Sequence, residues 1–147
     1  MNGKVVNIGI TKVKRGNIEN IDAVEAIKGK GLVNDRCYKE DNDKKCQITL
    51  IEIENINYYN KIKNTNISPI KFRRNIITEN INLNELVGKQ FFVGNVKLFA
   101  HDLCRPCKFL QESLQQTNLI KEFLHKGGLR CEILSSGKIF IGDIIEQ

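Results

Sequence analysis

The chain has 147 residues, of which 41% are hydrophobic and 27% are charged, a balance typical of a globular protein and too apolar for a disordered one. This length predicts a single domain over residues 1–147 and leaves no room for a cofactor domain beside a substrate domain. The net charge of +6 favours anionic partners, but it does not distinguish nucleic acid, a membrane surface and a small phosphate-bearing ligand.

The cysteine content indicates a reducing compartment. An odd number of cysteines without a secretion signal argues against a disulfide framework. No apolar stretch approaches the roughly 20 residues that would be needed to span a bilayer, so no membrane association is expected. We therefore expect a cytoplasmic protein with reduced thiols. The five cysteines are Cys37, Cys46, Cys104, Cys107 and Cys131.

The first third of the chain is predicted to be mainly β. Residues 4–13 are short and β-branched, which predicts a strand, and residues 21–28 could form a second one. Residues 29–38 contain glycines and an Asn-Asp pair that favour turns. Residues 39–45 are highly polar and predict an exposed loop, and residues 46–50 predict the next strand.

A helix is predicted to begin after Glu52. Apolar residues then recur every three positions, which is the spacing of one helix face, and Ser68-Pro69 is expected to end the helix. The residues of this face are Ile53, Ile56, Tyr59 and Ile62.

The second half of the chain returns to β structure. Residues 72–103 are predicted to be β-rich, with a hairpin turn at Gly94-Asn95. Residues 109–125 have helical periodicity, as one helix or two short ones, and residues 127–147 predict a strand, a turn and another strand. Many short strands with few helices predict a mainly-β fold, a closed sheet or barrel.

The sharpest local motif is Cys104-Arg-Pro-Cys107. A CxxC pair is found in thioredoxin-like redox sites and in zinc sites, but the first needs a βαβ setting and the second needs two further ligands. A third interpretation is one activated thiolate, because Arg105 and Lys108 would lower the pKa of Cys107. Two buried cysteines in a turn remain the simplest alternative.

Two other motifs could contact a ligand. The run Arg73-Arg74-Asn75 offers forked donors suited to phosphate or carboxylate, although a solvated basic edge is the commoner meaning. The pair Gly127-Gly128 could bring backbone N–H groups close to a ligand. The lysines are spread along the chain and are not grouped with aromatic residues, so specific nucleic-acid binding is not expected.

Taken in order, five stretches of the chain resemble a stand-alone MOSC domain, the family named for the C-terminal domain of molybdenum cofactor sulfurase. No single stretch is specific, but their order and spacing are. The stretches are GKGLVNDRCY (29–38), QITLIEIENI (47–56), FRRNIITENINLNELVGKQFFVGNVKL (72–98), CRPC (104–107) and GGLRCEILSSGKIFIGDII (127–145). Relatives often have Gly-Asp where this chain has Asn34-Asp35, and asparagine tolerates the positive φ that such a turn requires.

The resemblance implies a distorted closed β-barrel, of the kind also called pyruvate-kinase-barrel-like, with a few peripheral short α-helices. It also implies a ligand, the molybdenum cofactor, which is a pterin dithiolene with a terminal phosphate. The functional cysteine of the family falls on Cys107, as a molybdenum ligand or as the carrier of a persulfide. The cofactor-binding residues that the resemblance implies are Arg73, Asn75 and Thr49, with Arg36 and Arg130 as further contacts.

Three functions follow from this resemblance. The first is reduction of N-hydroxylated compounds with an external electron-donor protein. The second is a sulfur-carrier or cofactor-delivery module that receives persulfide on Cys107 from a cysteine desulfurase, and the third is a non-catalytic interaction domain. Pyridoxal phosphate is not expected, because the aminotransferase-like domain of the cofactor sulfurases is missing. The substrate and the oligomeric state stay open.

Overall fold

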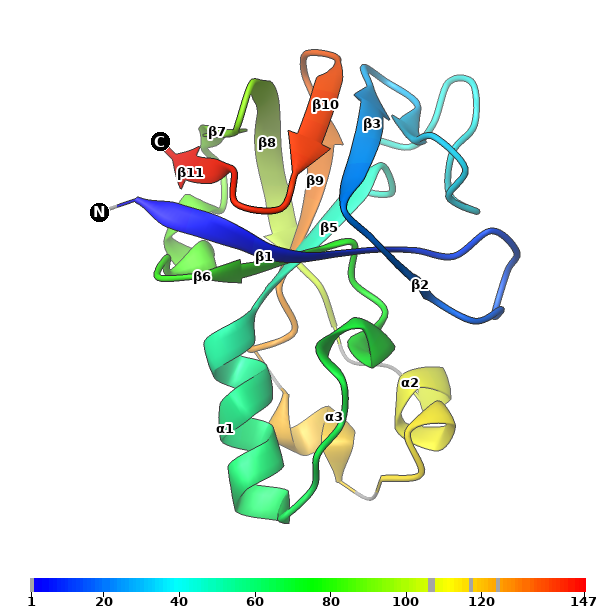
Figure 1. Cartoon of the computed structure of the whole chain (residues 1–147), viewed down its shortest axis with the longest axis vertical. Coiled ribbons are helices and arrows are strands. Elements are labelled where there is room, and N and C mark those ends of the chain that lie inside the picture. Colours follow the sequence, from blue (N-terminus) through cyan, green and yellow to red (C-terminus); the bar gives the residue numbers. More distant parts are fainter. Residues whose placement is uncertain (1, 106–107, 117, 124) are drawn as a thin grey trace.

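The computed structural model describes residues 2–105, 108–116, 118–123 and 125–147, with Lys108 as backbone only. It contains a β-barrel at one end and a small group of helices at the other (Figure 1). The mainly-β fold predicted from the sequence is confirmed.

Seven strands close the barrel. Their order is β11-β7-β8-β9-β5-β6-β1, and β1 pairs back with β11. Neighbouring strands are antiparallel except β5 and β6, which run parallel. The bounds are β1 (Gly3–Ile10), β5 (Ile48–Glu52), β6 (Ile76–Glu79), β7 (Gln90–Val93), β8 (Val96–Leu103), β9 (Leu129–Ile133) and β11 (Ile144–Glu146).

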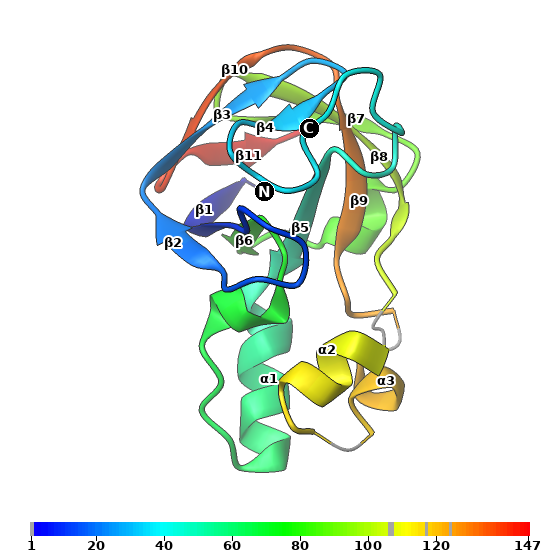
Figure 2. The same ribbon diagram turned by 90° about the vertical axis from the view of Figure 1, so that its right-hand side faces the viewer.

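Four further strands lie outside the ring. Strand β2 (Glu19–Ile21) extends the sheet beyond β1, and β10 (Gly137–Phe140), β3 (Ala23–Ile27) and β4 (Gly31–Leu32) form a small second sheet. In Figure 2 this second sheet lies across one end of the barrel, on the side away from the helices.

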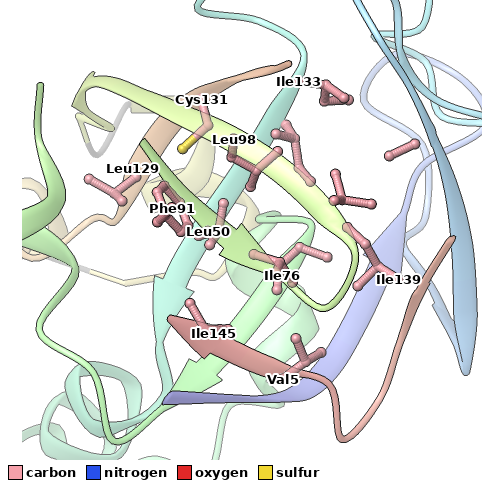
Figure 3. Close-up of a cluster of buried hydrophobic side chains, with 14 of the residues drawn as sticks. Val5, Leu50, Ile76, Phe91, Leu98, Leu129, Cys131, Ile133, Ile139 and Ile145 are labelled. Carbon is pink, nitrogen blue, oxygen red and sulfur yellow. The ribbon is translucent and has the colours of Figure 1, made fainter. Parts of the chain in front are cut away.

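The barrel interior is filled by aliphatic side chains from most of its strands. Figure 3 shows them converging from opposite walls of the barrel. Successive side chains of a strand point to opposite faces of the sheet, so every second residue of a barrel strand points into the barrel. Many of these inward residues are the β-branched residues that also favour strands. Fully buried examples are Val5, Leu50, Ile76, Leu98, Ile133 and Ile145.

Helix α1 (Ile53–Lys63) joins the parallel pair β5 and β6. Its predicted inner face is confirmed at Ile56 and Tyr59, which are buried, but Ile62 near its end is 45% exposed. The helix also ends earlier than Ser68-Pro69. Asn64 takes a left-handed conformation with φ of 53°, and its N–H caps the carbonyls of the last turn.

The helical periodicity of residues 109–125 is confirmed as two short helices, one of the two forms that the sequence allowed. They are α2 (Lys108–Ser113) and α3 (Leu119–Glu122). Together with α1 and the 3₁₀ turn η1 (Pro69–Phe72) they enclose a second apolar cluster, in which the rings of Tyr59, Phe72 and Phe123 pack at centroid distances of 5.0 to 6.1 Å. No helix within the described part of the chain is long and apolar enough to cross a membrane.

The remaining differences from the sequence-based prediction concern strand ends and pairing. The first strand stops at Ile10 rather than at residue 13, and the predicted strand 21–28 is divided between β2 and β3. The hairpin at Gly94-Asn95 is confirmed as β7–β8, which follows the 3₁₀ turn η2 (Leu83–Leu86). Residues 127–147 form three strands, β9, β10 and β11, rather than the two that the sequence predicted; β9 lies between β8 and β5, while β10 pairs with β3.

Candidate functional site

A cavity of about 280 Å³ lies where the strand ends of the barrel meet the loops that lead to the helices. All five predicted cofactor-binding residues line it, although they come from four separate parts of the chain. They are Arg36, Thr49, Arg73, Asn75 and Arg130. The fold therefore brings together the set that the resemblance implied.

Arg130 is held by a carboxylate on the neighbouring strand. Its Nε donates to Asp102 Oδ1 at 2.8 Å and its Nη2 donates to Oδ2 of the same carboxylate. The two residues face each other across β8 and β9, so strand register sets this pair. The Arg130 hydrogen bond lowers the pKa of Asp102 below its usual range, which keeps the carboxylate ionised and the guanidinium oriented.

Asn75 and Thr49 are bonded to each other. Asn75 Oδ1 accepts from the Thr49 backbone N–H at 3.1 Å, and the Asn75 N–H donates to Thr49 Oγ1 at 3.1 Å. Asn75 Nδ2 also donates to the Gly9 carbonyl at 3.1 Å. These bonds join the start of β6 to β5 and β1. Much of the hydrogen-bonding capacity of Asn75 is thus used to build the wall of the cavity.

Two adjacent arginines enter the site before β6. Arg73 has a left-handed backbone with φ of 66°, and its Nη1 donates to the Gly16 carbonyl at 2.9 Å. Arg74 also lines the cavity, and its Nε donates to the Gly127 carbonyl at 2.9 Å. The resemblance implied roles for Arg73 and Asn75 but not for Arg74, which the sequence analysis noted only as part of the run Arg73-Arg74-Asn75. Its position inside the same run is the signal that could have indicated it.

The turn before Arg36 is built on a buried carboxylate. Asn34 has φ of 72°, which confirms that asparagine can occupy this turn in place of glycine. Asp35 accepts the Thr11 N–H at 2.9 Å on Oδ1 and the Cys37 N–H at 3.2 Å on Oδ2. The Arg36 N–H in turn donates to the Thr11 carbonyl at 2.6 Å. These bonds fix the backbone from which the exposed Arg36 side chain reaches the cavity.

Among the described residues, three cysteine thiols line the same cavity. The predicted functional residue Cys107 lies outside the described residues. Cys104 is 6% exposed, and burial raises the pKa of its thiol while Arg74 opposes the rise. Cys37 and Cys46 also border the cavity, although the sequence shows them only as scattered single residues.

The described thiols do not form a metal site. Across the described ranges, no group of three or more His, Cys, Asp or Glu side chains could hold a metal ion. The zinc interpretation of the CxxC motif therefore receives no support from these residues.

The pair Gly127-Gly128 serves backbone packing and does not line the cavity. A Cβ on Gly127 would come 2.7 Å from the Cys104 carbonyl oxygen, and the Cys104 N–H donates to the Gly128 carbonyl at 2.7 Å. Neither glycine is among the described residues that line the cavity, and the suggestion that they offer N–H groups to a ligand stays a prediction. Their lack of side chains lets β9 approach β5 and the end of β8.

A comparison with protein-family profiles identifies the family of this chain. The profile of the MOSC domain matches residues 34–146, which is most of the chain. The chain belongs to the MOSC domain family. This family is associated with binding of the molybdenum cofactor.

Solved structures agree with the MOSC fold. YuaD from Bacillus subtilis superposes with a TM-score of 0.86 at 20% identity, covering 99% of this chain and 95% of that one. YiiM from Geobacillus stearothermophilus gives a TM-score of 0.77 at 17% identity, covering 98% and 74%. YiiM from Escherichia coli gives 0.74 at 16% identity, covering 99% and 69%. A search of curated proteins finds no match.

The cavity of this MOSC domain fits an anion. Asp35 is the only carboxylate among the described residues that line it, and both of its oxygens already accept backbone N–H groups. Forked guanidinium donors match phosphate oxygens in geometry and charge. The residues present therefore suit the terminal phosphate of a pterin cofactor. The arginines of the lining are Arg36, Arg73, Arg74, Arg105 and Arg130.

Proposed function

We propose that this MOSC protein binds the molybdenum cofactor in the arginine-lined cavity and acts as a small reductase component for N-hydroxylated compounds. Electrons would come from a separate donor protein. The observation that carries the proposal is the convergence of the five implied cofactor residues on one cavity, with five arginines in its lining.

The arginines have different tasks in this proposal. Arg130 is oriented by Asp102, so it offers a fixed donor to an anionic group of the cofactor. Arg36 is exposed at the cavity and is free to reach the terminal phosphate, while Arg73 is anchored to the Gly16 carbonyl. Pre-oriented donors lose less side-chain entropy on binding than mobile ones do.

Asn75 and Thr49 act as positioning residues. Their mutual hydrogen bonds hold the Arg73-Arg74-Asn75 segment against β5 and β1. When bound, the cofactor would supply two-electron redox chemistry at molybdenum. Cys107 is the proposed soft ligand, because thiolate sulfur suits this metal. Cys104 is a poor alternative, since burial keeps its thiol protonated at neutral pH.

The first experiment measures cofactor content. The protein is expressed in a host that makes molybdenum cofactor, and bound molybdenum and pterin are measured for wild type, Cys107→Ser and Cys104→Ser. We expect wild type to hold both, Cys107→Ser to lose about tenfold or more of its molybdenum, and Cys104→Ser to retain most of it. Wild type without molybdenum or pterin would contradict the proposal, and unchanged molybdenum in Cys107→Ser would refute the ligand assignment.

A second candidate function is favoured by the thiols around the cavity. Cys37, Cys46 and Cys104 all border it, which suits a module that passes sulfur. In that role Cys107 would accept a persulfide from a cysteine desulfurase and deliver it during cofactor maturation. Incubation of apo-protein with a desulfurase and cysteine, followed by cyanolysis, tests this. Sulfane sulfur in wild type and not in Cys107→Ser would favour the carrier, and none in either would exclude it.

A further inference from the structure

A second cavity of about 440 Å³ adjoins the first. The two share four lining residues, so a ligand in one can continue into the other. The shared residues are Arg36, Cys37, Arg73 and Arg74, and the second cavity adds Lys14, Arg15, Phe109 and Leu110. Its volume lies within the range of roughly 300–1,000 Å³ that is common for small-molecule sites.

Planar groups are stacked in the wall of this second cavity. The guanidinium carbon of Arg15 lies 4.9 Å from the centroid of the Phe109 ring, and that of Arg73 lies 5.2 Å from it. Both arginines have left-handed backbones, with φ of 58° and 66°. Such backbone conformations are uncommon for residues other than glycine, and strained ones cluster at functional sites.

The charged side chains that the structure describes in the lining of the second cavity are all positive. Of the eight described residues that line it, five are cationic and none is a carboxylate. Leu110 is buried and supplies an apolar surface beside Phe109. A ligand that satisfies this lining has a flat ring for Phe109 and the guanidinium planes, and more than one negative charge for the shared arginines.

We propose that the second cavity binds a nucleoside monophosphate, with its base against Phe109 and Arg15 and its phosphate at the arginines shared with the first cavity. A phosphate carries up to two negative charges and accepts forked hydrogen bonds from several guanidinium groups, which a single carboxylate does less well. The nucleotide is either the tail of a nucleotide-extended form of the pterin cofactor or a free nucleotide. Only the first of these sources rests on the proposed function.

The binding experiment uses the apo-protein and isothermal titration. Guanosine monophosphate and cytidine monophosphate are compared with the corresponding nucleosides and with inorganic phosphate. We expect at least one mononucleotide to bind tenfold or more tightly than both its nucleoside and phosphate. Phe109→Leu and Arg15→Gln should each remove most of this preference while leaving phosphate binding nearly unchanged.

The chain offers a matched control for these variants. Lys126 Nζ lies 4.6 Å from the centroid of the exposed Tyr58 ring, so the two also form a cation–π pair, and neither is among the described residues that line the two cavities. Tyr58→Leu and Lys126→Gln should leave nucleotide affinity unchanged. A mononucleotide that binds no better than phosphate would overturn the proposal, as would equal losses in the control variants or a strong preference for polynucleotides.

The holoprotein distinguishes the two sources. Nucleotide is released by acid and counted against molybdenum. Close to one nucleotide per molybdenum identifies the cofactor tail, whereas molybdenum without nucleotide, together with binding in the titration, identifies a free nucleotide. Molybdenum without nucleotide and without binding in the titration overturns this inference and leaves the proposed function intact. If no molybdenum is found, the proposed function fails and the titration alone decides the nucleotide site.

Discussion

At the scale of the residue, the cavity is built from polar groups that already have protein partners. Arg130 is bonded to Asp102, Arg74 to Gly127 and Asn75 to Thr49. Each bond uses some of the side chain's capacity to hydrogen-bond a ligand, but it also fixes the direction in which the side chain points. A resemblance can therefore identify Asn75 as part of the site without revealing that much of its contribution is to position the neighbouring arginines.

Two buried thiols, Cys104 at the cavity and Cys131 in the barrel core, predict a pH dependence of stability. Burial raises the pKa of Cys104, and it raises the pKa of Cys131 further. In the unfolded chain these thiols ionise near pH 8.5. Above that pH the unfolded state loses protons that the folded state still holds, so the free energy of unfolding falls as pH rises.

We expect wild type to lose up to about 1 kcal/mol per thiol between pH 8.5 and 9.5 beyond the loss seen in Cys104→Ala/Cys131→Ala. Urea unfolding at pH 7.5, 8.5 and 9.5 measures this difference, and the double variant corrects for lysine and tyrosine titration common to both proteins. Parallel pH profiles for the two proteins would show that the thiols do not contribute.

At the scale of the element, strand lengths follow local sequence but close approach of strands depends on glycine. Gly128 has φ of 96° just before β9, and a Cβ there would overlap the Leu50 carbonyl oxygen of β5. Gly88 has a similar φ of 80° with no atom within 4 Å of the position of a Cβ. A comparison of alanine substitutions at the two glycines therefore distinguishes the cost of backbone strain from the cost of steric overlap.

Gly88→Ala is expected to cost about 1–2 kcal/mol, the strain of a left-handed backbone alone. Gly128→Ala should cost at least about 2 kcal/mol more, because β9 must move away from β5 and disturb the cavity wall. Chemical denaturation of the two variants measures the difference. Equal costs would mean that β9 can shift without penalty and that the overlap is relieved elsewhere.

At the scale of the whole molecule, the pairing of β1 with β11 turns an open sheet into a barrel. In Figure 1 these two strands lie side by side although they come from opposite ends of the described chain. Ile145 is fully buried in the barrel core (Figure 3), whereas its neighbour Ile144 is 47% exposed. The short strand β11 therefore both closes the barrel and contributes a side chain to its core.

Ile145→Ala should reduce the free energy of unfolding by about 2–5 kcal/mol, as is usual when a buried isoleucine is truncated. Ile144→Ala removes the same atoms from the outer face and should cost less than about 1 kcal/mol. Thermal and denaturant unfolding of both variants test this. Similar losses in the two would indicate that β11 packs loosely and that closure contributes little to stability.

The sequence by itself determined much of the local structure and the family to which the chain belongs. β-Branched segments and a three-residue apolar repeat predicted β1, β5 and α1, because these patterns reflect which face of an element is buried. The ordered motifs predicted the MOSC fold and the residues Arg36, Thr49, Arg73, Asn75 and Arg130. The end of α1 was missed because one asparagine in a left-handed conformation, rather than the later proline, stops the helix.

The tertiary structure alone decided what lies together. The parallel pairing of β5 with β6, the separation of β9 from β10 and the closure by β11 depend on contacts between distant segments, which local patterns do not encode. The same contacts bring Cys37, Cys46 and Cys104 to one cavity and place Phe109 close to the guanidinium groups of Arg15 and Arg73 in a second. Residue chemistry is local, but a site is a property of the folded chain, because only folding sets the distances between residues.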